Sequence, residues 1–321
     1  MKRFKNILYV YEESVVQNAT FASAVSLAQN NQANLTLIDV IPEVTSGIGM
    51  PPGEPISTDL ETARIAERRK TLESMIASHQ QDMTIHIDVL VGIKFLEVIR
   101  AVIKGGYDLL IKPAENPDYI ERLFGSEDMH LLRKCPCPVW MMKAEETSNY
   151  DCIVAAVDMD PDELKSSEQA LNQEVLELAS SLALSELASL HLVHVWDEPA
   201  AGFVGLWTDN PTEAERSMID GAHDRHENAM KILTQNLSRH IGAEAYEYLA
   251  PRIHLLRGDA KKEIPALVRN LNADLVVMGT VARTGISGFI IGNTAEAILD
   301  QLQCSVLAIK PPGFVSPVMQ D

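Results

Sequence analysis

Short apolar runs alternate with longer stretches of helical spacing along this chain. In the second half, runs rich in β-branched residues are apolar on both faces, as the buried strands of a parallel sheet are. These runs span residues 153–157, 190–195, 275–278 and 306–309. Between them, apolar residues recur with a helical period at 166–185, 212–241, 261–271 and 294–302. The alternation predicts an α/β fold with a parallel sheet.

Two helix starts can be predicted from local sequence. Asn210 followed by Pro211 is typical of an N-cap with Pro at the first helical position, and Thr58 with Glu61 has the spacing of a capping box. We therefore expect one helix to begin after Asn210 and another after Thr58.

The whole pattern occurs twice. The apolar positions of segment 33–41 match those of segment 188–196. Three pairs of identical residues repeat at a spacing of 166 or 167 residues: Gly92 with Gly258, Asp108 with Asp274, and Cys137 with Cys304. Self-similarity at a fixed spacing indicates a duplicated domain. We predict one domain at 1–145, a second at 150–313, and a tail at 314–321.

Composition narrows the class of protein. The chain has 321 residues, 46% of them hydrophobic, and its 27 Lys and Arg against 45 Asp and Glu give a net charge of −18. This composition excludes a disordered chain, and the negative charge argues against direct binding of nucleic acid. Four cysteines are too few for a disulfide framework, the apolar run 7–11 is too short for a signal peptide, and we find no membrane-spanning stretch. We predict a cytoplasmic protein.

Two strand ends in the second half are the predicted place for a ligand. In open parallel sheets, ligands bind beyond the carboxyl ends of strands where the strand order reverses. Asp158 follows the first strand, and Met278-Gly279 ends the fourth, before a loop of small residues. Gly292-Asn293-Thr294 then opens the next helix, whose free N–H groups would suit a phosphate. A glycine-rich connection without a ligand is the alternative.

These residues carry a resemblance to a known family. Val277-Met278-Gly279, Arg283-Thr284-Gly285, the segment 292–296 and the last strand with Cys304 together resemble the tandem universal stress proteins. The resemblance implies a five-stranded parallel sheet of order 3-2-1-4-5 in each half, with helices on both faces. Nucleotide-binding members of that family carry Gly, two residues, Gly, nine residues, Gly, and then Ser or Thr.

This chain departs from that motif in both halves. In the second half Gly279 and Gly292 keep the spacing, but Ala282 replaces the middle glycine and Asn293 the hydroxyl residue. In the first half Lys112-Pro113 occupies the strand end, which predicts a Lys112–Glu12 pair filling the crevice. We expect weakened binding of ATP or another nucleotide in the second half alone. The resemblance implies these contacts for it: Asp158, Val195, Met278, Gly279, Ala282, Arg283, Gly292, Asn293 and Thr294.

Two loops are unusually apolar. Segments 41–55 and 199–211 each follow the second strand of their half and contain Ile48, Met50, Phe203 and Trp207. Such loops could cover a pocket for an apolar, lipid-like ligand, form a subunit contact, or simply pack beneath the helices.

The sequence gives little support for a metal site or a catalytic site. His223 and His226 share a helix face, but the period of a strand places His191 and His194 on opposite faces, so we predict no metal site. The cysteines of Cys135-Pro-Cys137 are too close for an ordinary disulfide, and no catalytic motif is found.

We therefore predict a stress-response protein that binds a small molecule and regulates without catalysis. A slow ATP hydrolase is the alternative. The last strands, 139–142 and 306–309, are apolar sheet edges, and we expect them to pair so that the chain is its own pseudo-dimer. A homodimer of the whole chain stays an open alternative.

Overall fold

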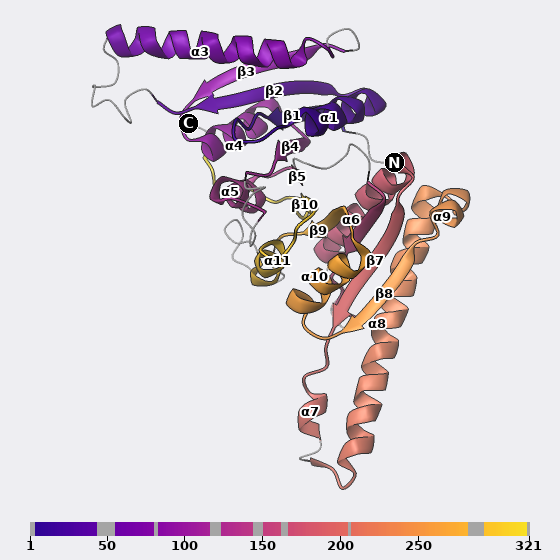
Figure 1. Cartoon of the computed structure of the whole chain (residues 1–321). Helices are drawn as coiled ribbons and strands as arrows, with labels where there is room; N and C mark the ends of the chain where they lie inside the picture. The colour runs from indigo at the N-terminus through magenta and orange to yellow at the C-terminus, as the bar shows by residue number, and fades with distance from the viewer. Residues whose placement is uncertain are drawn as a thin grey trace.

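The computed structural model describes residues 4–43, 55–79, 83–115, 123–143, 150–161, 166–204, 207–281 and 292–319. Most of its elements are labelled in Figure 1. The first half comprises β1 (Asn6–Val10), α1 (Asn18–Asn31), β2 (Asn34–Ile41), α3 (Pro55–Ile76), β3 (Ile85–Val91), α4 (Lys94–Gly105), β4 (Leu109–Pro113), α5 (Ser126–Lys134) and β5 (Val139–Met142). The second half comprises β6 (Cys152–Ala156), α6 (Ser166–Glu186), β7 (Ser189–Trp196), α7 (Ala201–Val204), α8 (Pro211–Ile241), α9 (Ala243–Leu249), β8 (Arg252–Arg257), α10 (Ala260–Leu271), β9 (Leu275–Gly279), α11 (Asn293–Leu299) and β10 (Ser305–Ile309).

All ten strands form one sheet of order β3-β2-β1-β4-β5-β10-β9-β6-β7-β8. Within each half the strands are parallel and follow the predicted order 3-2-1-4-5. β5 and β10 pair antiparallel, with Met141 opposite Val306 and Val139 opposite Ala308. The expected pairing of the last strands is confirmed, and the sheet runs unbroken through both halves (Figure 1).

Helices cover both faces of the sheet because its central strands are apolar on both sides. Every residue of β4, β5 and β10 is buried. Residues of α1, α3, α6 and α8 join the core cluster on one face, and residues of α4, α5, α10 and α11 join the cluster on the other. This two-sided burial is the reason that the strand sequences lack the alternation of a half-exposed sheet.

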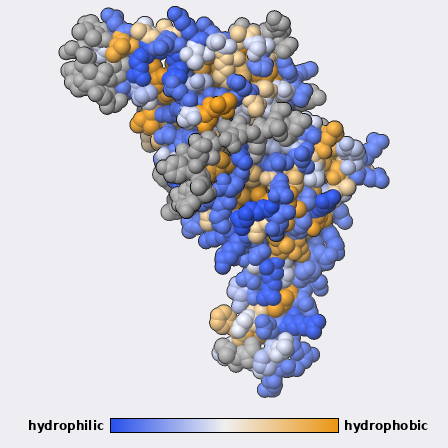
Figure 2. Space-filling model, viewed as in Figure 1, coloured by the Kyte–Doolittle hydropathy of each residue, from blue (hydrophilic) through white to orange (hydrophobic). Residues whose placement is uncertain are grey.

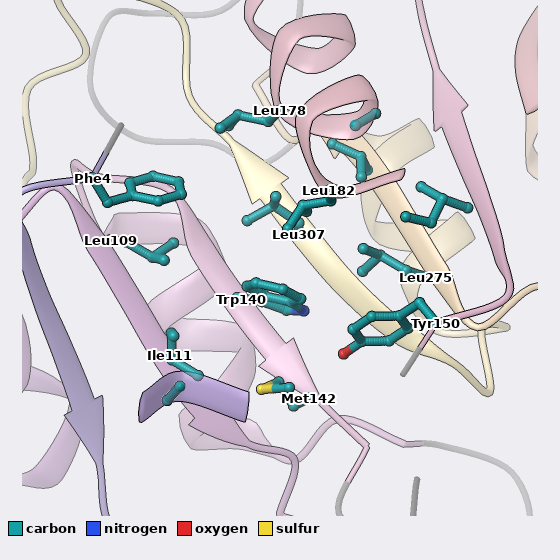
Figure 3. Packing of buried hydrophobic residues seen from close by; sticks show 14 of the residues in the cluster. Phe4, Leu109, Ile111, Trp140, Met142, Tyr150, Leu178, Leu182, Leu275 and Leu307 are labelled. Carbon is teal, nitrogen blue, oxygen red and sulfur yellow. The ribbon is translucent and has the colours of Figure 1, made fainter. Parts of the chain in front are cut away.

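The junction between the halves contains large apolar side chains from both. Trp140 of β5 stacks on Tyr150 with ring centroids 5.7 Å apart. In Figure 3, Leu307 of β10 lies near these rings, and Leu178 and Leu182 of α6 cover it. The two halves therefore meet through a hydrophobic core and not through a polar interface.

The repeat is visible in backbone geometry. Gly92 and Gly258 both adopt φ = +147°, and each N–H bonds the last carbonyl of the preceding second strand, that of Ile41 and that of Trp196. A side chain is strained at this φ, and a Cβ would also crowd Glu97 or Glu263. Both halves thus have a glycine at the equivalent position, where the chain turns from the third strand into the next helix.

One expected helix start is wrong and another is confirmed. Thr58 lies inside α3, which begins at Pro55, so Thr58 and Glu61 form no capping box. Asn210 is the N-cap of α8 with Pro211 after it, but its side chain donates to the Glu213 carboxylate and not to the backbone. α11 ends at Leu299, three residues before the expected end. Among the described helices, none combines the length and apolarity that crossing a membrane requires.

Candidate ligand-binding site

Lys112 fills the strand-end crevice of the first half. Its side chain, at the end of β4, is fully buried. The ammonium Nζ lies 2.7 Å from Asp128 Oδ1, 3.0 Å from Glu12 Oε2 and 3.3 Å from Glu115 Oε1. The expected pair with Glu12 is confirmed, and two further carboxylates complete a buried ion cluster.

Asp128 occupies the anion-binding position of a helix N-terminus. It is the third residue of α5, and its Oδ2 accepts hydrogen bonds from the backbone N–H groups of Glu115 (2.9 Å) and Gly125 (3.3 Å). The bond from the N-cap Gly125 is that of a capping box, in which the third residue of the helix accepts from the N-cap N–H. Asp128 thus caps the start of α5, with Lys112 as its counter-ion.

The charges of this cluster are mutually stabilised. Burial alone would raise the pKa of Glu12, but the ammonium groups of Lys112 and of Lys94, 3.0 Å away, lower it to about 2. Burial likewise opposes a charged Lys112, yet the surrounding carboxylates raise its pKa above the ordinary value. Glu12 and Lys112 therefore stay ionised at neutral pH.

The second half places uncharged side chains at the equivalent positions. Met278 stands where β4 has Lys112, and Ala295, the third residue of α11, stands where α5 has Asp128. Asp158 follows β6 as Glu12 follows β1, and its side chain is exposed. Asn172 of α6 fixes the backbone of Asp158 by accepting from its N–H (3.1 Å) and donating to its carbonyl (2.7 Å).

Seven of the nine predicted nucleotide contacts lie in described segments at this edge of the sheet. Asp158 and Val195 extend from β6 and β7, Met278 and Gly279 end β9, and the segment 292–294 opens α11. The Met278 side chain is buried in the core and leaves little surface for a base, whereas Asn293 and Thr294 are exposed. Ala282 and Arg283 lie outside the described residues.

A buried lysine that sequence reasoning missed lies beside this edge. Lys310, which follows β10, donates to the Leu132 carbonyl of the first half and to the Thr280 hydroxyl of the second. Burial lowers its pKa to about 7. A lysine follows the last strand of each half, Lys143 and Lys310, and this repetition was the available sequence signal. The burial of Lys310 itself results from the junction of the two halves, which the sequence does not show.

A cavity of about 430 Å³ opens between α6, α8 and the loop after β6. This volume is in the range of small-molecule sites. Much of its wall is apolar, supplied by Met159, Pro161, Leu176, Ala229, Ile232, Leu233 and Leu237. Asp158 contributes to its rim, and Glu177 lies 3.3 Å from His240 at another point of the wall.

A family model described as the universal stress protein family matches residues 3–143 and again 149–310. The chain belongs to this family. Universal stress protein E of Escherichia coli K12 is 34% identical over 230 residues, which cover 71% of this chain and 68% of that protein. Universal stress protein E of Photorhabdus laumondii is 29% identical over 329 residues, covering 99% of this chain and 98% of its own.

Solved structures share the fold of this universal stress protein chain. A protein of unknown function from Pseudomonas aeruginosa PAO1 matches with a TM-score of 0.68 at 23% identity, covering 96% of this chain and 93% of its own. A universal stress protein from Archaeoglobus fulgidus matches with a TM-score of 0.62 at 17% identity, covering 95% and 98%. At these identities the likeness concerns the fold alone.

Those predicted apolar-ligand residues that the structure describes do not line a pocket. The side chains of Phe203 and Trp207 are 65% and 87% exposed, so they line no enclosed wall. Figure 2 shows apolar surface only in small patches among hydrophilic residues, including along α7 and α8. Ile48 and Met50 lie outside the described residues. α7 lies beyond the sheet and packs against α8 (Figure 1). Contact of Phe203 and Trp207 with an apolar ligand stays a prediction.

The histidines of the second half pair with one another, and the cysteines of the first half lie side by side. His191 pairs with His254 and His194 with His226, each at 2.9 Å between ring nitrogens. His191 and His194 thus have separate partners and cannot share an ion. Cys135 and Cys137 are free thiols with sulfurs 3.6 Å apart.

Proposed function

We propose that this chain is a cytoplasmic stress-response protein that binds a small molecule through its second half and regulates without catalysis. One observation carries the proposal: an internal ion cluster of Lys112, Asp128 and Glu12 fills the first-half crevice. Met278 and Ala295, in the equivalent places, offer no charge that could fill the second-half crevice in this way. Family membership and the cavity beside Asp158 support the same assignment.

A nucleotide such as ATP is the first ligand to test. Asp158 would accept a hydrogen bond from base or ribose, and the exposed start of α11 would meet phosphate, with Arg283 as its counter-ion. Two side chains weaken this site: the Ala282 methyl, where the motif has glycine, and Asn293, where it has a hydroxyl. We expect micromolar or weaker binding for the unaltered chain.

Restoring the motif tests the assignment by calorimetry. Each lost contact is worth about 1–3 kcal/mol, or roughly 5- to 150-fold in affinity. Ala282→Gly combined with Asn293→Ser should tighten ATP binding at least tenfold, and Asp158→Ala should reverse much of that gain. Glu12→Gln is the matched first-half control and should leave affinity unchanged. A double variant that binds no better than the parent would refute a weakened nucleotide site.

The hydrolase alternative is tested on the same samples. We expect no release of phosphate from ATP, with or without Mg²⁺. Turnover that Asp158→Ala abolishes would replace the regulatory assignment with a slow ATP hydrolase.

The cavity supports an apolar ligand as the second candidate. Its wall between α6 and α8 is largely apolar, and Ile232 on that wall is exposed. Native mass spectrometry of protein purified from its own cells would show which class of molecule is retained. Leu233→Trp, which fills the cavity, should remove a lipid-like adduct but leave a nucleotide adduct in place.

A further inference from the structure

A second group of ligating side chains lies on α8, apart from the strand-end site. His223, Asp224 and Glu227 each offer one ligand atom, an imidazole nitrogen or a carboxylate oxygen, and these atoms lie within 4.8 Å of one another. None of the three lines the cavity. They lie on the part of α8 that runs beside the end of β7 (Figure 1).

Helix geometry and ligand chemistry both favour an ion here. His223 and Glu227 are four residues apart, so they project from the same face of one long helix. One nitrogen and two carboxylate oxygens suit a borderline divalent ion such as Zn²⁺, Co²⁺ or Ni²⁺, whereas Ca²⁺ and Mg²⁺ prefer oxygen alone. The net charge of −18 raises the local concentration of cations around the protein.

Neighbouring aromatic rings restrict the position of the His223 side chain, but they do not bind its ring nitrogens. Trp196 packs edge-on against its ring, with centroids 5.9 Å apart, and stacks on His226 at 5.4 Å. His226 bonds His194, whose other ring nitrogen lies 3.2 Å from the Val157 carbonyl, so these two imidazoles are committed to each other and to the sheet. His223 is the imidazole left on the outer side of the cluster.

The contacts that compete with an ion are weak. His223 Nδ1 is 3.8 Å from Asp224 Oδ1, beyond a hydrogen bond. Lys231 lies 3.0 Å from the Glu227 carboxylate, but its side chain is 56% exposed. Exposed pairs of this kind contribute little free energy, so an ion can displace the ammonium.

From this geometry we propose that His223, Asp224 and Glu227 form a binding site for a divalent transition-metal ion, with water completing the coordination. The site uses residues of the second half outside the candidate nucleotide crevice. It is independent of whether a nucleotide binds.

Calorimetry on the full chain, free of any polyhistidine tag and treated with EDTA, tests the proposal with ZnCl₂. We expect one ion per chain, and His223→Ala and Glu227→Gln should each weaken binding at least tenfold. His240→Ala is the matched control, because His240 lies on the same helix but pairs with Glu177, and it should leave the affinity unchanged. Millimolar Mg²⁺ should not compete.

Fluorescence then locates the ion. In a Trp207→Phe background, Ni²⁺ should quench the emission of Trp196, and His223→Ala should remove that quenching. The proposal is wrong if the wild-type chain binds no Zn²⁺, if His223→Ala and His240→Ala bind equally, or if Mg²⁺ displaces the ion, which would indicate diffuse attraction to surface carboxylates.

Discussion

At the scale of single residues, Lys112 and Asp128 form the closest ion pair of the buried cluster at the end of β4. Both side chains are fully buried and 2.7 Å apart, and the Asp128 carboxylate also accepts two backbone N–H groups. Removing one member of a buried pair leaves the other charge uncompensated, which costs more than the pair itself contributes.

Asp128→Ala should therefore destabilise the chain by about 3–5 kcal/mol, because it removes the nearest of the three carboxylates around the buried Lys112 ammonium and leaves two N–H groups without their acceptor. Urea denaturation measures this loss. Inorganic phosphate should restore part of the stability by binding in the vacated position. Ser126→Ala, an exposed change in the first turn of the same helix, should have little effect. An equal loss for the two variants would contradict the role of Asp128.

The decrease in the free energy of unfolding at acid pH should report the protonation of Glu12. Its pKa is about 2 in the folded chain against an ordinary value of 4.5, so the folded state favours the carboxylate. Its contribution is present above pH 4.5 and is lost as the pH falls toward 2. The difference in free energy of unfolding between the wild type and Glu12→Gln should shrink across that interval, measured by urea titration at several pH values. A constant difference would show that Glu12 is not stabilised as an anion.

At the scale of elements, β5 and β10 join the two halves through a shared apolar core. Trp140 contributes the largest side chain of β5 to that core, and its indole N–H has no partner among the described residues. Its contribution is thus packing, not hydrogen bonding.

Trp140→Ala should cost about 3–5 kcal/mol of unfolding free energy, as other large-to-small core changes do. Trp140→Phe should cost clearly less, because no hydrogen bond in the described structure is lost. Equilibrium unfolding of both variants checks this order. Equal losses would imply that the indole nitrogen matters.

At the scale of the whole molecule, the strands of the described segments form one sheet, and each of its faces carries a core cluster with residues from both halves. Beyond the β5–β10 pairing, Arg133 of α5 contacts Glu296 of α11, and Lys310 bonds the Leu132 carbonyl. Each half therefore covers an edge that would otherwise be exposed.

A fragment of residues 1–147 should consequently dimerise or aggregate, because the four buried residues of β5 become an open edge. Light scattering of the fragment beside the full chain measures this. Met141→Lys in the same fragment should suppress the association, since a charge on an edge strand opposes pairing. A monomeric, soluble fragment would show that β5 needs no partner.

Much of the fold could be predicted from the sequence because its evidence is local and repeated. Apolar runs buried on both faces identified β6, β7, β9 and β10 to within a residue, and Asn210-Pro211 identified the start of α8. β8 was missed by this pattern because it is at the edge of the sheet and none of its residues is buried. The spacing of Thr58 and Glu61 predicted a wrong helix start, because a capping box is a short pattern that also occurs inside helices. The exposure of Phe203 and Trp207 could not be predicted, because apolar composition does not say whether a segment packs on the sheet.

The sequence by itself determined the duplication and the Lys112–Glu12 pair, because spacing and residue type suffice for both. The strand order followed from the resemblance to the family. Only the tertiary structure decided that Asp128 and Glu115 join that pair, that a cavity opens between α6 and α8, and that Lys310 is buried. These features depend on how residues far apart in the chain approach one another. Such distances follow from helix and strand packing, which periodicity alone does not specify.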